Sequence, residues 1–264
     1  MATTSPSTID GACTLQVFPG EGSLALAAAD HFVAAADQAT RVAGRCVVAL
    51  SGGATPERLH ALLATDRYAA EIDWSRLHVF WGDERCVPPD DPASNYRMAR
   101  ESLLDHVPLP PEHIHRIRGE DDPTTAAAAY ERELRDIFET PAGPPRTAPG
   151  TRFDLILLGM GANGHIASLF PELGAVRETR RWVFADYVGE VSMWRVTLTP
   201  PVINAAAEVI VLVTGGNKAG MLRRVLDGPL QPEMLPAQAI APRKGRLRWL
   251  VDASAAADLP RSRQ

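Results

Sequence analysis

The chain has 264 residues, a net charge of −5 at neutral pH and a hydrophobic content of 45%. These values suit one large, soluble α/β domain with a sizeable core. The acidic balance argues against nucleic acid as a partner, and no apolar stretch is long enough to span a membrane. The three cysteines, Cys13, Cys46 and Cys86, are odd in number and far apart, so they predict neither a disulfide framework nor a metal site and suit a reducing compartment.

Short apolar runs alternate with amphipathic segments along the chain. After a strand near residues 14–18, the alanine-rich residues 23–39 show helical spacing. Strands near residues 46, 77, 153, 209 and 247 then alternate with helices near residues 56, 95, 124, 165 and 217. This order predicts a Rossmann-like, mostly parallel sheet with helices on both faces.

We expect a single domain over residues 14–258. A flexible tail, 1–13, precedes it, without the basic and apolar regions of a signal peptide, and a second tail, 259–264, follows. The stretch 140–151 is rich in proline and glycine and predicts an exposed loop within the domain, because the segment after it supplies strands to the same sheet. A division into two domains at this loop is the alternative.

A glycine turn follows the strand predicted at 46–50. Ser51, Gly52, Gly53 and Thr55 lie in this turn, and Pro56 begins the next helix. Free N–H groups at a helix start, two glycines and two hydroxyls suit a phosphate. An ordinary turn with Thr55 as N-cap is the alternative. The lysine of a nucleoside-triphosphate loop is absent, which disfavours such a ligand.

Charged residues follow the strand predicted at 77–81. Asp83, Glu84 and Arg85 come directly after it. Two carboxylates and a guanidinium at the end of a strand could orient a sugar and hold an anion. A solvated charged turn is the alternative.

A histidine follows a second glycine turn. The apolar residues 153–158 predict a buried strand, and Gly159, Gly161 and Gly164 separate it from His165. Because open parallel sheets bind ligands at the carboxyl ends of their strands, this imidazole is expected at the mouth of a cleft. The glycines also fit a dinucleotide fingerprint with Asp186 downstream, but that fingerprint normally opens the first strand–helix unit of a domain.

Five linked motifs resemble the 6-phosphogluconolactonases of the glucosamine-6-phosphate isomerase/6-phosphogluconolactonase family. They are LSGGATP at 50–56, WGDERCVP at 81–88 with SNY at 94–96, GMGANGHIASLFP at 159–171, RVTLT at 195–199 and VTGGNK at 213–218. The resemblance covers about residues 15–255. It implies a fold similar to the glucosamine-6-phosphate deaminase and ribose-5-phosphate isomerase type.

The resemblance also implies an activity. It indicates a cytoplasmic, metal-independent hydrolase without a cofactor that opens 6-phospho-D-glucono-1,5-lactone to 6-phospho-D-gluconate in the oxidative pentose phosphate pathway. The expected partner is this small sugar-phosphate lactone, with neither nucleic acid nor membrane, and we expect a monomer or weak homo-oligomer.

By resemblance, His165 is the general base, whose ring takes a proton from water and later returns one. The turn residues Ser51, Gly52, Gly53 and Thr55 would bind the phosphate, with Arg85, Arg195 and Lys218 as cations. The family usually has an aspartate where this chain has Asn163, so either that carboxylate is dispensable or another acid such as Asp83 serves His165. Asn163→Asp is therefore expected to change the pH optimum more than the maximum rate.

Three other functions stay open at this point. The first is a sugar-phosphate isomerase or deaminase, whose motif has carboxylates at the positions of Asn163 and Phe170. In such an enzyme, Asp83 would be the base. A non-catalytic sugar-phosphate sensor would use the same loops but leave His165 idle. A dinucleotide-binding dehydrogenase is the weakest contender.

Overall fold

The main sheet runs through the whole molecule. The computed structural model describes residues 7–10, 13–139, 152–260 and 263. The sheet has the strand order β1-β2-β10-β9-β6-β3-β4. Its strands are β1 (Ser7–Asp10), β2 (Cys13–Phe18), β3 (Cys46–Leu50), β4 (Leu77–Trp81), β6 (Leu155–Gly159), β9 (Glu208–Val213) and β10 (Arg246–Asp252). Only β1 is antiparallel to its neighbour among these described strands, so the predicted mostly parallel sheet is confirmed.

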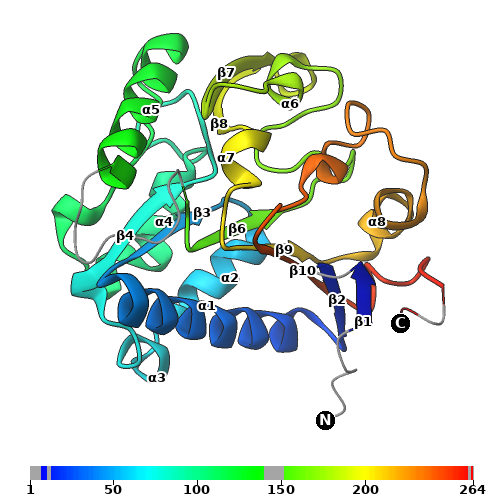
Figure 1. Ribbon diagram of the computed structural model, residues 1–264, viewed down its shortest axis with the longest axis horizontal. Coiled ribbons are helices and arrows are strands. Elements are labelled where there is room, and N and C mark those ends of the chain that lie inside the picture. The colour runs from blue at the N-terminus through cyan, green and yellow to red at the C-terminus, as the bar shows by residue number, and fades with distance from the viewer. Residues whose placement is uncertain (1–6, 11–12, 140–151, 261–262, 264) are drawn as a thin grey trace.

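Strands β3 and β9 form where the sequence is almost entirely apolar. Every residue of β3 and β9 is buried, as expected for parallel strands covered on both faces. In Figure 1, α1 (Glu21–Ala43) and α2 (Ala54–Leu63) lie on one side of the sheet and α5 (Pro123–Glu139) on the other. Strands from before and after residues 140–151 share the sheet, and the loop predicted over 140–151 lies outside the described residues.

Parts of both expected tails belong to the fold. Within the predicted tail 1–13, β1 pairs with β2, with Ser7 opposite Leu15. At the other end, Leu259 is buried in the core, and the guanidinium of Arg263 lies 2.7 Å from the Asp227 carboxylate. The predicted tail boundaries are therefore wrong at these positions, because packing and pairing across the fold hold residues that have little local pattern.

A second, smaller sheet was not predicted. It has the order β5-β8-β7, with β5 (Asp83–Arg85), β8 (Met193–Leu198) and β7 (Val183–Val188) paired antiparallel. β5 is short and charged, so its strand conformation depends on pairing with β8 and not on its own residues.

The helix predicted near residue 165 is wrong. Residues 160–173 form turns and isolated bridges, and the next helix, α6, spans only Gly174–Arg177. Gly164 has φ +83° and Ala167 has φ +50°, which a right-handed helix does not allow. The remaining helices are α3 (Asp66–Ala69), α4 (Asn95–Ser102), α7 (Pro200–Ile203) and α8 (Ala219–Asp227), with short 3-10 helices η1 (Trp74–Arg76), η2 (Leu104–His106), η3 (Pro111–His113), η4 (Gly189–Val191), η5 (Gly216–Lys218) and η6 (Pro236–Ala239).

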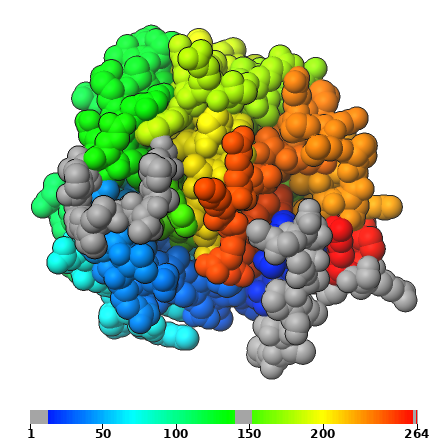
Figure 2. All heavy atoms as spheres, viewed as in Figure 1, coloured from blue at the N-terminus to red at the C-terminus, as the bar shows by residue number. Residues whose placement is uncertain are grey.

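The segment from α8 to β10 folds back over the sheet. In Figure 2 its orange atoms lie directly against the yellow atoms of residues near 200. The amide of Asn204 ties the two together, because it donates to the backbone oxygen of Ala239 and accepts from the backbone N–H of Ala241. No helix in the described part of the chain combines the length and the apolar character needed to cross a membrane.

Candidate active site

The cleft lies where the direction of strand addition reverses. β3 pairs with β4 on one side and with β6 on the other, and ligands of open α/β sheets bind beyond the carboxyl ends of strands at such a point. A cleft of about 410 Å³ opens there, a size typical of ligand sites. All ten sequence-predicted site residues line it: Ser51, Gly52, Gly53, Thr55, Asp83, Arg85, Asn163, His165, Arg195 and Lys218.

The ring of His165 is clamped between two neighbours. On one side the ring of Phe170 stacks on it, with centroids 4.2 Å apart and planes 18° apart. On the other side lies the backbone of Gly161, where an added Cβ would sit 2.1 Å from the ring carbon Cε1. The close approach of the ring therefore requires a glycine at position 161. The contacts with Phe170 and Gly161 together fix the plane in which the imidazole ring lies.

Asn163 fixes which ring nitrogen carries the proton. Its Oδ1 accepts the backbone N–H of His165 at 3.1 Å and faces Nδ1 of the same residue at 2.6 Å. Because an amide oxygen only accepts, Nδ1 must be the protonated nitrogen of the neutral ring, and Nε2 keeps its lone pair. The Nδ2 of Asn163 donates to Oε2 of Glu190 at 2.8 Å.

The electrostatic surroundings keep this ring neutral. Burial lowers the pKa of His165 below its usual 6.5, and the cations Arg195 and Lys218 act in the same direction. The carboxylates of Asp83 and Glu190 oppose that shift. Because burial is the largest effect, the imidazole is available as a base at neutral pH.

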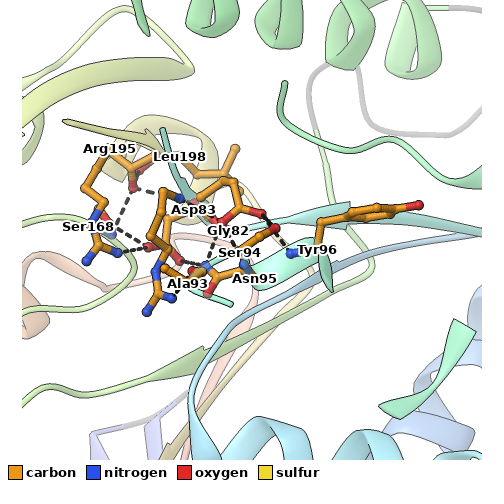
Figure 3. Close-up of polar contacts among 12 residues, drawn as sticks. Gly82, Asp83, Ala93, Ser94, Asn95, Tyr96, Ser168, Arg195 and Leu198 are labelled. Atoms are coloured by element: carbon orange, nitrogen blue, oxygen red, sulfur yellow. Dashed lines mark hydrogen bonds and ion pairs between the residues drawn. The ribbon is translucent and has the colours of Figure 1, made fainter. Parts of the chain in front are cut away.

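Asp83 is held by its own hydrogen bonds (Figure 3). Its Oδ2 accepts from the hydroxyl of Ser168 at 2.5 Å, and its Oδ1 accepts from the amide of Asn95 at 3.3 Å. The guanidinium of Arg195 lies 3.9 Å from the same carboxylate. Burial lowers the pKa of Arg195, and Asp83 opposes that effect. Asp83 thus acts on His165 through its charge, whereas the hydrogen-bond partner of the ring is Asn163.

Glu84 joins β5 to the start of α4. Its buried carboxylate accepts the backbone N–H groups of Arg85, Asn95 and Tyr96 and the hydroxyl of Ser94. Burial raises the pKa of Glu84, and the backbone hydrogen bonds oppose the rise. Of the predicted charged triplet, Asp83 and Arg85 therefore line the cleft, and Glu84 holds the loop behind them.

The glycine turn after β3 forms a further part of the cleft wall, next to Asn95. Gly53, at φ +100°, is the N-cap of α2, so the alternative reading with Thr55 as N-cap is wrong. The Thr55 hydroxyl instead lies 2.7 Å from that of Thr214, at the end of β9. An added Cβ on Gly52 would sit 1.8 Å from Oδ1 of Asn95, so only glycine fits beside that amide.

Three residues that line the cleft have a buried polar atom without a hydrogen-bond partner among the described residues. Ser51 Oγ, Arg85 Nε and Arg195 Nε are buried, and no hydrogen bond to them occurs within the described residues. Lys218 lies where η5 meets α8, and burial lowers the pKa of its ammonium. Hydroxyl, guanidinium and ammonium groups converging on one cleft suit an anion.

Sequence reasoning missed three residues that shape the site. Asn95 and Ser168 lie inside the quoted motifs, but only the fold shows that both bond to Asp83. Glu190 had no signal, because it reaches Asn163 from the turn between β7 and β8. Asp186 lies in β7 and accepts the backbone N–H of Ala175 at 2.7 Å, and no helix follows Gly164 directly, so the dinucleotide fingerprint lacks its structural context.

Comparison with known proteins shows the family of this chain. Residues 19–249 match the family described as glucosamine-6-phosphate isomerases/6-phosphogluconolactonase. The 6-phosphogluconolactonase of a Nostoc species is 39% identical over 93% of this chain and 98% of its own. That of Streptomyces coelicolor is 40% identical over 90% of this chain and 92% of its own.

Solved structures share the overall fold of this chain. The 6-phosphogluconolactonase of Trypanosoma brucei superposes with a TM-score of 0.81 at 28% identity and covers 93% of this chain and 98% of its own. A monomeric glucosamine-6-phosphate deaminase, 20% identical, has a TM-score of 0.77 over 92% of this chain and 99% of its own and shares the fold. This chain belongs to the glucosamine-6-phosphate isomerase/6-phosphogluconolactonase family.

Proposed function

We propose that the chain hydrolyses 6-phospho-D-glucono-1,5-lactone to 6-phospho-D-gluconate, the ring-opening step of the oxidative pentose phosphate pathway. The observation that carries this proposal is the contact between Nδ1 of His165 and Oδ1 of Asn163, which leaves Nε2 as the basic nitrogen of the neutral ring, in a cleft that the glycine turn also lines. Relatives that cover most of the chain are named for this activity. For the alternative, a deaminase, the solved structure reported above is 20% identical and shows a shared fold.

In the proposed reaction, Nε2 of His165 removes a proton from water as the water oxygen attacks the lactone carbonyl carbon. The bond between that carbon and the ring oxygen then breaks, and the imidazolium returns the proton to the departing oxygen. Asn163 holds the ring in the reactive tautomer throughout. Since Asp83 opposes the effect of burial on the pKa of His165, its carboxylate also stabilises the transient imidazolium.

We place the phosphate of the substrate at the glycine turn after β3. Gly52, Gly53 and Thr55 supply backbone N–H groups and a hydroxyl at the start of α2. Arg85, Arg195 and Lys218 supply positive charge against the phosphate dianion. All of these groups come from one chain, so a monomer or a weak homo-oligomer is sufficient for activity.

The reaction as proposed needs no metal or other cofactor, and we place it in the cytoplasm. Within the described residues, no cluster of three or more histidine, cysteine or acidic side chains could hold a metal ion. Addition and removal of divalent cations should leave the rate unchanged, and strict dependence on a metal would contradict this part of the proposal.

The test compares freshly generated phosphogluconolactone with the unphosphorylated lactone, each corrected for spontaneous hydrolysis. We expect a large preference for the phosphorylated compound, and His165→Ala should lose most turnover. His106→Ala is a matched control, because its ring lies outside the cleft. A fully active His165→Ala enzyme would refute the assignment, release of ammonia from glucosamine 6-phosphate would favour the deaminase, and binding without turnover would favour a sensor.

A further inference from the structure

We propose that Glu190 is a positioning residue for His165, supplying through the amide of Asn163 the carboxylate that residue 163 itself lacks. The expected changes in kcat rest on the proposed function, whereas the hydrogen bonds themselves do not. Two hydrogen bonds connect the three side chains. Nδ2 of Asn163 lies 2.8 Å from Oε2 of Glu190, and Oδ1 of Asn163 lies 2.6 Å from Nδ1 of His165.

Each end of the amide has a partner of defined polarity. A carboxylate only accepts hydrogen bonds, so Glu190 requires the NH₂ group of Asn163 to face it. The backbone N–H of His165 only donates, so it requires the oxygen of the same amide on the other side. The two requirements agree, and rotating the amide by half a turn would bring donor against donor at one end and acceptor against acceptor at the other.

The amide orientation determines the state of the catalytic ring. With Oδ1 facing Nδ1, the proton must lie on Nδ1 and the lone pair on Nε2. In the opposite orientation, Asn163 would donate to Nδ1, and the ring proton would lie on Nε2. Nε2 would then lack the lone pair that it needs to remove a proton from water. In a hydrolase with a comparable imidazole base, a substitution that leaves the ring in the wrong tautomer lowers kcat by about 10⁴-fold.

Glu190 also contributes charge to the site. It lines the cleft from η4, in the turn of the β7–β8 hairpin. The charged groups around the ring are Asp83 on β5, Arg195 on β8, Lys218 on η5 and Glu190, and the two carboxylates raise the pKa of His165 against burial and the two cations. Removing the charge of Glu190 should therefore move the acid limb of the pH–rate profile to lower pH.

Two substitutions separate the charge from the hydrogen bond. Glu190→Gln retains an oxygen that accepts from Asn163, so kcat at high pH should stay within about 3-fold of the wild type while the acid limb moves to lower pH. Glu190→Lys presents only donors to the NH₂ group of Asn163, so kcat should fall by about 100-fold. KM should not rise, because the added cation attracts an anionic substrate.

A second-site change provides the rescue. In Asn163→Asp/Glu190→Lys, a carboxylate at residue 163 accepts from both the lysine and Nδ1 of His165, so most of the lost kcat should return. Asn163→Asp alone places two carboxylates against each other and should move the acid limb to higher pH. Glu112→Lys is the control for net charge, since Glu112 is exposed and lies in η3, outside the cleft.

The deciding measurements are kcat, KM and their pH profiles, together with nitrogen NMR of the imidazole in the unliganded proteins. We expect the neutral ring of the wild type to carry its proton on Nδ1 and that of Glu190→Lys to shift toward Nε2. An unchanged kcat and tautomer in Glu190→Lys, or failure of Asn163→Asp to restore kcat, would overturn the inference. A wild type that shows this tautomer but no lactone hydrolysis would instead overturn the proposed function.

Discussion

Replacing Gly161 with alanine tests how the ring of His165, the proposed general base, is held in place. The new Cβ would lie 2.1 Å from Cε1, 2.2 Å from Nδ1 and 2.7 Å from Nε2 of His165. Contacts of this kind become ordinary only at 3.4 Å, so the ring must move by about 1 Å. Phe170 stacks on the other face and is itself buried, so the ring has little space in which to retreat.

The displacement should mainly affect the chemical step. A misplacement of about 1 Å in a reacting group costs about 100-fold in rate, or about 2.7 kcal/mol of transition-state stabilisation. We therefore expect kcat of Gly161→Ala to fall by about 100-fold. KM should change little, because the turn at Gly52 and Gly53 is untouched by the substitution.

The assay is lactone hydrolysis at several substrate concentrations, with thermal unfolding measured in parallel to detect any general loss of structure. Gly22→Ala is the matched control, because a Cβ added to Gly22 in α1 meets no atom within 4 Å. If Gly161→Ala folds normally and keeps the wild-type kcat, the ring is not held as described, and the argument from ring position is refuted.

Three further predictions concern charge. Lys218→Met should raise KM for the phosphorylated lactone by about 10- to 100-fold, the cost of one charge-assisted hydrogen bond, and leave KM for the unphosphorylated lactone unchanged; equal effects on both substrates would contradict the phosphate role. Asp83→Asn should move the acid limb of the pH–rate profile to lower pH, because the Asp83 charge raises the pKa of His165, and an unshifted profile would count against that coupling. Burial lowers the pKa of His60 from 6.5 to about 4, so the unfolded chain binds more protons in this window and stability should fall as the pH drops from 6.5 toward 4. His60→Gln should therefore show a smaller loss of Tm on acidification, and an equal loss would place the acid-sensitive group elsewhere.

The sequence alone predicted the main sheet and ten residues that the structure brings to one cleft. Continuous apolar runs such as β3 and β9 are buried on both faces, so their local pattern reports their environment directly. Gly52, Gly53 and His165 follow such runs, and parallel strands bring their carboxyl ends to one edge of the sheet. This local rule is sufficient to place residues from distant motifs in one cleft.

The tertiary structure decided what each of these residues contacts. Asp83 and Ser168 are separated by 85 positions in the chain, and Asn163 and Glu190 by 27, and no periodicity encodes such pairs. β5 becomes a strand only by pairing with β8, and the turn that carries Glu190 reaches the cleft only because β7 and β8 form a hairpin. Side-chain hydrogen bonds depend on distances of tenths of an ångström between elements, and those distances exist only after the hydrophobic core has fixed how the elements pack.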